Sequence, residues 1–94
     1  MRVISRKKLR EAEAKHGDLV GPLGTWYKVA KKAGWKHIED IRKTYPLADP
    51  VGPYTVFNIK GNSYRLIVKI EYAKHLIFVK AVLTHAEYDK GDWK

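Results

Sequence analysis

The sequence predicts an α+β fold, and three observations lead to this class. The chain has 94 residues, of which 45% are hydrophobic, enough for one packed core but not for two. Apolar residues of the first half recur at helical spacing, as in Leu23, Trp26 and Tyr27. From Tyr54 onward they alternate with period two and are rich in β-formers, which is typical of strands. We therefore expect a single domain over residues 1–94.

The chain begins with a short strand and a basic helix. Residues 1–4 are apolar enough for a strand, and Ser5 is a residue type that can cap a helix. The spacing predicts a helix over Arg6–His16, ended by Gly17. Cations fill its first turn, where they oppose the helix dipole. A sequence that tolerates this arrangement can use the charges for binding, although a solvated helix face would also accept them.

A second helix is predicted from Pro22 to about Ala33, because proline suits the first turn of a helix and Gly34 follows the end. Its apolar stripe indicates core packing. Residues 37–45 allow one or two further helical turns. Residues 46–53 contain three prolines and a glycine, so we expect a connecting loop there.

Three strands are predicted in the second half, over about 54–59, 63–72 and 75–83. If the turn between the last two is symmetric, Lys80 lies opposite Ile67. One face of that hairpin is then apolar throughout and forms the core side. It carries Tyr64, Leu66, Val68, Ile70, Tyr72, His75, Ile77, Val79, Ala81 and Leu83. The opposite face gathers three cations and, from the preceding strand, an amide: Arg65, Lys69, Lys80 and Asn58.

The residues that follow the last strand have the types needed for proton transfer. Thr84 and Glu87 match the capping-box pattern, so a short helix should begin there. His85, Tyr88 and Asp89 then share one side of that helix.

Together these groups suggest a pocket for a phosphate. Arg65 and Lys80 are candidates to hold the phosphate oxygens, and His85 or Tyr88 to move a proton, with Asp89 orienting His85. We expect further phosphate or RNA contacts from Asn58, Lys60, Asn62 and Lys69.

Each of these residues also has a structural alternative. Arg65 could pair with Glu71 or Glu87, and Asn62 could serve only as a turn residue. Asp89 could form no more than a helical i, i+4 pair with His85.

The charge balance points to a polyanionic partner. The formal net charge is +9, and residues 1–47 carry twelve basic and five acidic residues, against seven and five in residues 48–94. Nucleic acid, the ribosome or an acidic protein would suit such a chain. The candidate docking cations lie on the two predicted helices: Arg6, Lys7, Lys8, Arg10, Lys28, Lys31 and Lys32.

Several classes of protein are not supported. The chain has no cysteine, which excludes disulfides and thiolate chemistry and fits a reducing cytoplasm. No His or carboxylate cluster has ligand spacing, so we expect no metal and no cofactor. No apolar run is long enough to span a membrane, and the basic start lacks the apolar stretch of a signal peptide.

Two sequence blocks carry a family resemblance. Val56–Arg65 and Val82–Asp89 resemble the signature of the HigB branch of RelE-like bacterial toxins, and Ser5–Leu9 and Trp26–Ala33 resemble the opening helices of that family. The resemblance implies two N-terminal helices packed on an antiparallel sheet. It implies an endoribonuclease that cuts mRNA, usually on the ribosome. It also implies a HigA-type helix-turn-helix antitoxin, with operator DNA reached only through that antitoxin.

By motif, the resemblance assigns functional positions to Asn58, Arg65, Lys80, His85, Tyr88 and Asp89. We therefore expect a metal-independent ribonuclease in which an RNA 2′-hydroxyl attacks the adjacent phosphate. Two alternatives stay open on sequence alone, because binding and cleavage use the same cations. The chain could be a non-catalytic RNA- or ribosome-binding module, or an inactive relative that only binds its antitoxin.

Overall fold

A five-stranded sheet, in the order β1-β5-β4-β3-β2, forms the centre of the molecule. The computed structural model describes all residues from 1 to 94. Neighbouring strands are antiparallel, except that β1 runs parallel to β5. The strands are β1 (Arg2–Ile4), β2 (Asp49–Val51), β3 (Tyr54–Ile59), β4 (Tyr64–Glu71) and β5 (Leu76–Thr84).

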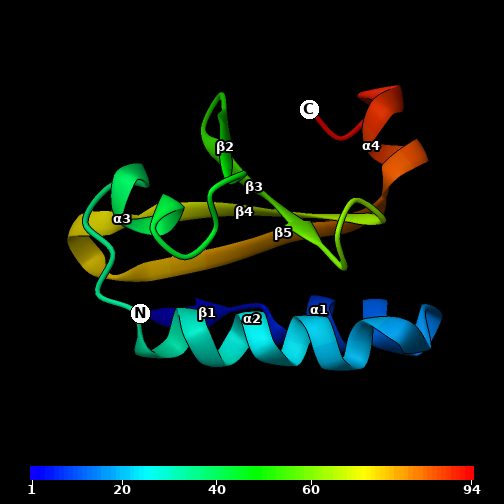
Figure 1. The fold of residues 1–94 in the computed structure, drawn as a ribbon, viewed down its shortest axis with the longest axis horizontal. Helices are drawn as coiled ribbons and strands as arrows, with labels where there is room; N and C mark the ends of the chain where they lie inside the picture. The colour runs from blue at the N-terminus through cyan, green and yellow to red at the C-terminus, as the bar shows by residue number, and fades with distance from the viewer.

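Helices lie on both sides of this sheet (Figure 1). Two long ones cover one face, and two short ones lie beyond the other. The first pair is α1 (Arg6–Lys15) and α2 (Val20–Lys32); the second is α3 (Ile38–Arg42) and α4 (His85–Lys90). The predicted α+β class, with N-terminal helices packed on a small sheet, is confirmed, although β1 makes the sheet mixed rather than wholly antiparallel.

The core lies between the sheet and the long helices. Phe57 is fully buried, and three aromatic rings surround it: Trp26 at 5.5 Å, Tyr45 at 5.3 Å and Trp35 at 6.2 Å between ring centroids. The apolar stripe of α2 faces this cluster, as its spacing predicted. Burial of these large rings removes much apolar surface from water, which is the main favourable contribution to folding.

Two local predictions are wrong. Ser5 does not cap α1: it has a left-handed φ of 69° and its side chain forms no capping hydrogen bond. A capping residue needs an extended backbone, and the tight turn from β1 into α1 does not provide it. Residues 49–51, expected in a loop, form the edge strand β2. Pro50 is tolerated there because an edge strand need not donate on its outer side.

The hairpin of β4 and β5 changes register halfway along. The symmetric pairing holds from Glu71 with Leu76 to Val68 with Val79, but Ile67 then pairs with Ala81, so Lys80 is an extra residue in a β-bulge. The prediction that Lys80 lies opposite Ile67 is therefore wrong. Beyond the bulge, Val82 replaces Ala81 on the core side, where it packs against the buried cluster.

Candidate functional site

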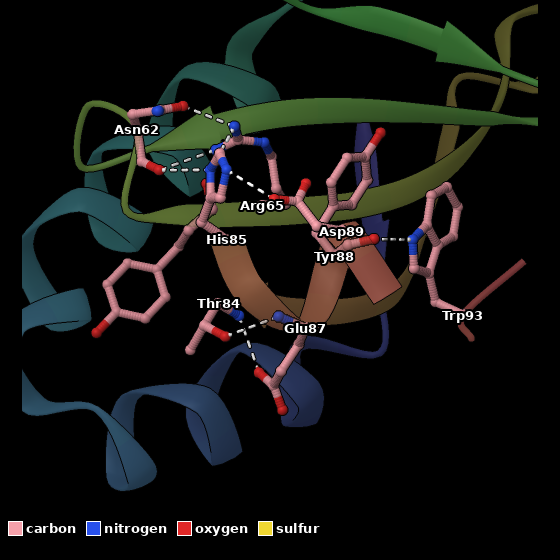
Figure 2. Close-up of polar contacts among 9 residues, drawn as sticks. Asn62, Arg65, Thr84, His85, Glu87, Tyr88, Asp89 and Trp93 are labelled. Carbon is pink, nitrogen blue, oxygen red and sulfur yellow. Dashed lines mark hydrogen bonds and ion pairs between the residues drawn. The ribbon is translucent and has the colours of Figure 1, made fainter. Parts of the chain in front are cut away.

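Four of the polar residues singled out from the sequence, Asn62, Arg65, His85 and Asp89, meet where the turn before β4 lies beside the start of α4. The backbone N–H of His85 donates to the carbonyl of Ser63 at 3.0 Å, which joins the two segments. The predicted capping box of α4 is present: the Glu87 N–H donates to Thr84 Oγ1 at 3.2 Å, and the Thr84 N–H donates to Glu87 Oε1 at 2.9 Å (Figure 2). The Thr84 N–H holds the pKa of Glu87 below its ordinary value.

Arg65 is the most constrained charged residue of the molecule. Its side chain lies on the sheet face away from α1 and α2, yet the residue is only 8% exposed. Nη1 donates to the carbonyls of Asn62 and Tyr64, both at 3.2 Å. Nη2 donates to Asn62 Oδ1 at 2.6 Å and contacts His85 Nδ1 at 3.0 Å (Figure 2). Asn62 is thus more than a turn residue, because its backbone and its side chain both hold the guanidinium.

The positive charge of Arg65 has no acidic partner. Neither of the carboxylates considered from the sequence pairs with it: Glu71 contacts Lys74 at 3.7 Å, and Glu87 completes the capping box. All its acceptors are carbonyl, amide or imidazole groups. A buried charge held only by neutral groups leaves a positive potential at its position, which favours an anion.

His85 connects Arg65 to a carboxylate. Its Nε2 lies 2.9 Å from Asp89 Oδ2, and its Nδ1 lies 3.0 Å from Arg65 Nη2 and 3.2 Å from the carbonyl of Asn62. The i, i+4 pair with Asp89 therefore exists, and it orients the imidazole at the same time. From the sequence alone, the helical pair and the orienting role of Asp89 were two alternatives.

Tyr88 lies between Arg65 and a residue that the sequence analysis did not select. The Arg65 guanidinium is 5.6 Å from the centre of the Tyr88 ring, and Trp93 stacks on that ring at 5.1 Å with an interplanar angle of 18°. Trp93 Nε1 donates to the carbonyl of Tyr88 at 3.0 Å (Figure 2). A tryptophan just after the helix-ending Gly91 was the available sequence signal for this contact.

A hollow of about 460 Å³ opens beside Arg65 and Tyr88. The segment after α3 forms its other wall, with Leu47 71% exposed at the surface. Its lining consists of Arg42, Pro46, Leu47, Ala48, Asp49, Val56, Asn58, Arg65 and Tyr88. Asn58 is therefore placed at the candidate site as predicted. Arg42, which sequence reasoning missed, donates from Nε to the carbonyl of Ala48 at 3.1 Å.

The other predicted phosphate contacts lie elsewhere. Lys80 does not line the hollow, and its ammonium lies 5.2 Å from the centre of the Tyr54 ring. Lys69 is exposed, four residues from Arg65 along β4, or roughly 13 Å at about 3.3 Å per strand residue. The three cations expected on this face therefore do not converge in the structure.

Lys60 has a different partner, Asp18, at the other end of the turn. Lys60 Nζ lies 2.7 Å from Asp18 Oδ2, and the Tyr64 hydroxyl donates to Asp18 Oδ1 at 3.0 Å. The hydrogen bond from Lys60 lowers the pKa of Asp18, and the same contact raises the pKa of Lys60. Desolvation and the bond to Asp18 raise the pKa of Tyr64.

The basic helices form a second charged region on the far side of the molecule. The Arg6 guanidinium lies 4.1 Å from the centre of the Tyr27 ring. Around this contact is a hollow of about 780 Å³, lined by Arg6, Gly24, Tyr27, Lys28, Lys31 and Lys32. Of the other three docking candidates, Lys7 and Arg10 are exposed, whereas Lys8 donates to the carbonyl of Lys80 at 3.1 Å.

Two further findings concern metals and membranes. No three His, Cys, Asp or Glu side chains gather closely enough to hold a metal ion. None of the helices has both the length and the apolar character needed to cross a membrane.

Comparison with known proteins gives a consistent result. Residues 20–91 match the model of the HigB toxin family, described as the RelE-like toxic component of a toxin-antitoxin system. The chain is 30% identical to the mRNA interferase HigB of Escherichia coli O6:H1 (strain CFT073), over 96% of this chain and 90% of the relative. It is 26% identical to the mRNA interferase toxin HigB of Escherichia coli strain K12 and to the mRNA interferase HigB of Shigella flexneri, in each case over 95% of this chain and 88% of the relative.

Proposed function

Because the chain belongs to the HigB family of RelE-like toxins, we propose that it is an mRNA interferase, a metal-independent endoribonuclease that cleaves mRNA on the ribosome and thereby blocks translation. We propose that an antitoxin of the HigA, helix-turn-helix type neutralises it, and that it reaches operator DNA only through that antitoxin. Its place of action is the cytoplasm, where translating ribosomes are found.

One observation carries the catalytic part of this proposal. Arg65 brings a permanent positive charge, without an acidic partner, to the wall of a hollow that also contains Tyr88 and Asn58. A phosphodiester is an anion, and its charge increases as the 2′-oxygen attacks phosphorus. A fixed cation at that point stabilises the transition state without reorganising during the reaction.

The remaining residues supply proton transfer and further charge. The Tyr88 hydroxyl forms no hydrogen bond within the protein and is accessible to solvent, so it is free to exchange a proton with the 2′-hydroxyl or the 5′-oxygen. His85, paired with Asp89, is the second candidate for that step. Lys80 can add a second cation if its ammonium leaves the Tyr54 ring.

We propose that four further polar residues contact the RNA around the reacting phosphate: Asn58, Lys60, Asn62 and Lys69.

The basic helices suit docking to an anionic partner. Exposed cations around Arg6 and Tyr27 favour ribosomal RNA phosphates or an acidic surface of the antitoxin. If the ribosome holds the mRNA in the required geometry, free RNA should be a poor substrate, because positioning accounts for much of the rate.

The test is to produce the chain alone in a bacterium and map new 5′ ends on cellular mRNA, for the native protein and for Arg65→Lys and Arg65→Met. We expect new 5′ ends and growth arrest with the native protein. Arg65→Lys should lose most cleavage because an ammonium cannot make the same set of hydrogen bonds, and Arg65→Met should lose all of it. Circular dichroism of each variant separates loss of function from unfolding.

The control is Lys74→Met, which removes an exposed cation from the turn between β4 and β5. It should cleave at the native rate. Ribosome binding without new 5′ ends from the native protein would favour the non-catalytic binding module. Antitoxin binding without either activity would favour the inactive relative.

A further inference from the structure

We infer that His85 is a positioning residue that holds the Arg65 guanidinium in its orientation. It does not itself transfer a proton in the cleavage reaction. This inference rests on the proposed function, because it assigns a role within the same site. It is carried by two contacts of the imidazole: Asp89 at Nε2 and Arg65 at Nδ1.

The partners of the imidazole determine where its proton lies. A guanidinium can only donate, so His85 Nδ1, 3.0 Å from Arg65 Nη2, must present its lone pair. The ring proton is then on Nε2, where the Asp89 carboxylate accepts it at 2.9 Å. One neutral tautomer satisfies both neighbours, and the carboxylate selects it. The carbonyl of Asn62, 3.2 Å from Nδ1, already accepts a hydrogen bond from Arg65 Nη1 and does not require a second donor.

Neither ring nitrogen is free for catalysis in this arrangement. The lone pair of Nδ1 is used by Arg65, and the proton of Nε2 is used by Asp89. A general base or acid must come within hydrogen-bond reach of the proton it moves. His85 is also absent from the lining of the hollow beside Arg65, whereas Tyr88 is part of that lining and has a free hydroxyl.

The imidazole completes the set of hydrogen bonds that holds the guanidinium. Arg65 makes three bonds to the carbonyls and the amide of the turn and one to His85, so all four N–H groups of Nη1 and Nη2 are used. Nε forms no bond within the protein and is accessible to solvent, so it is left for an anion. Loss of the hydrogen bond from Arg65 Nη2 to His85 Nδ1 would free one end of the guanidinium, and Nε would then no longer be held in a fixed direction.

Protonation of His85 should therefore weaken the site. The charged and titratable groups around the ring are Asp89 on its own helix and Arg65 on β4, joined by the Asn62 carbonyl from the turn. A second ring proton would turn the Nδ1 acceptor into a donor that faces a cation.

The test compares His85→Asn with His85→Ala on translating ribosomes. The asparagine amide can place an oxygen about where Nδ1 lies and can accept from Arg65, but it cannot act as a base near neutral pH. We expect His85→Asn to cleave within about tenfold of the native rate. His85→Ala should lose far more. Loss of about 10²–10⁴ in rate by both variants, the cost of removing an acid or base, would overturn the inference.

A second measurement does not depend on activity or on the stability of a variant. A long-range ¹H–¹⁵N spectrum of the native protein reports which ring nitrogen of His85 is protonated. We expect an unprotonated Nδ1 and a protonated Nε2 at neutral pH, and a protonated Nδ1 would overturn the inference. If the native protein does not cleave mRNA, the proposed function fails, while this spectrum still decides whether His85 holds Arg65 as an acceptor.

Discussion

The Asp18 carboxylate lies 2.7 Å from the ammonium of Lys60 and ties the turn before β4 to the short 3-10 helix between α1 and α2. Lys60 occupies this position with a left-handed φ of 52°, and Gly61 follows at 63°. The same turn provides Asn62, whose carbonyl and amide oxygens hold Arg65. A contact outside the candidate site therefore supports the loop that shapes it.

Asp18→Asn should loosen this turn and lower thermal stability at neutral pH. Because the pKa of Asp18 is held below its ordinary value of 3.8, the carboxylate contributes stability above that value and loses it as pH falls through the lowered pKa. The melting temperatures of the native protein and the variant should differ at pH 7 and draw together as the pH falls through the lowered pKa of Asp18. A difference in melting temperature that stays the same over the whole acid range would contradict the assigned role of the carboxylate.

Thr84→Ala should destabilise the protein by about 1 kcal/mol, because it removes the oxygen that accepts the Glu87 N–H at the start of α4. Urea unfolding measures this difference. Thr44→Ala is the matched control, since Thr44 is exposed and its side chain makes no hydrogen bond. Equal unfolding midpoints for Thr84→Ala and the control would show that the cap contributes nothing measurable.

Substitutions of Lys80 test whether the lysine in the β-bulge takes part in the proposed reaction. Lys80→Ala should reduce ribosome-dependent cleavage, and Lys80→Arg should keep or improve it, because a guanidinium binds phosphate with two parallel hydrogen bonds. Initial rates of mRNA cleavage distinguish the variants, with Lys74→Ala as the control for loss of one positive charge. If Lys80→Ala cleaves at the native rate, Lys80 takes no part in the reaction and only contacts the Tyr54 ring.

Charge reversal of Lys28, Lys31 and Lys32 should weaken ribosome binding and reduce its dependence on salt. Each phosphate contact contributes about 0.7–0.9 to the magnitude of the slope of log affinity against log salt concentration, so loss of three should reduce that magnitude by roughly 2–3. Binding should be measured at several salt concentrations. The control reverses Lys36, Lys43 and Lys74, which lie outside the docking hollow. If both sets weaken binding equally, net charge rather than docking explains the effect.

Helix geometry and strand alternation were sufficient to predict contacts between residues that are close in the sequence. Thr84 and Glu87 are three residues apart and His85 and Asp89 four apart, so the capping box and the imidazole–carboxylate pair could be inferred from helix geometry alone. The alternation of apolar residues similarly identified the three main strands. The aromatic stripe of α2 identified the helix face that packs on the sheet.

Only the tertiary structure decided how these local pieces meet. The sequence by itself determined the α+β class, every strand except β2, the cap of α4 and the residues of the His85–Asp89 pair. It could not determine the bulge at Lys80, because Ala81 and Val82 are both apolar and either parity leaves an acceptable core face. The burial of Arg65 and the Asp18–Lys60 contact, 42 residues apart, depend on segments that come together only after the sheet has formed. Hydrogen bonds between distant segments leave no periodic pattern in a sequence, so the partners of Arg65 could be read only from the folded chain.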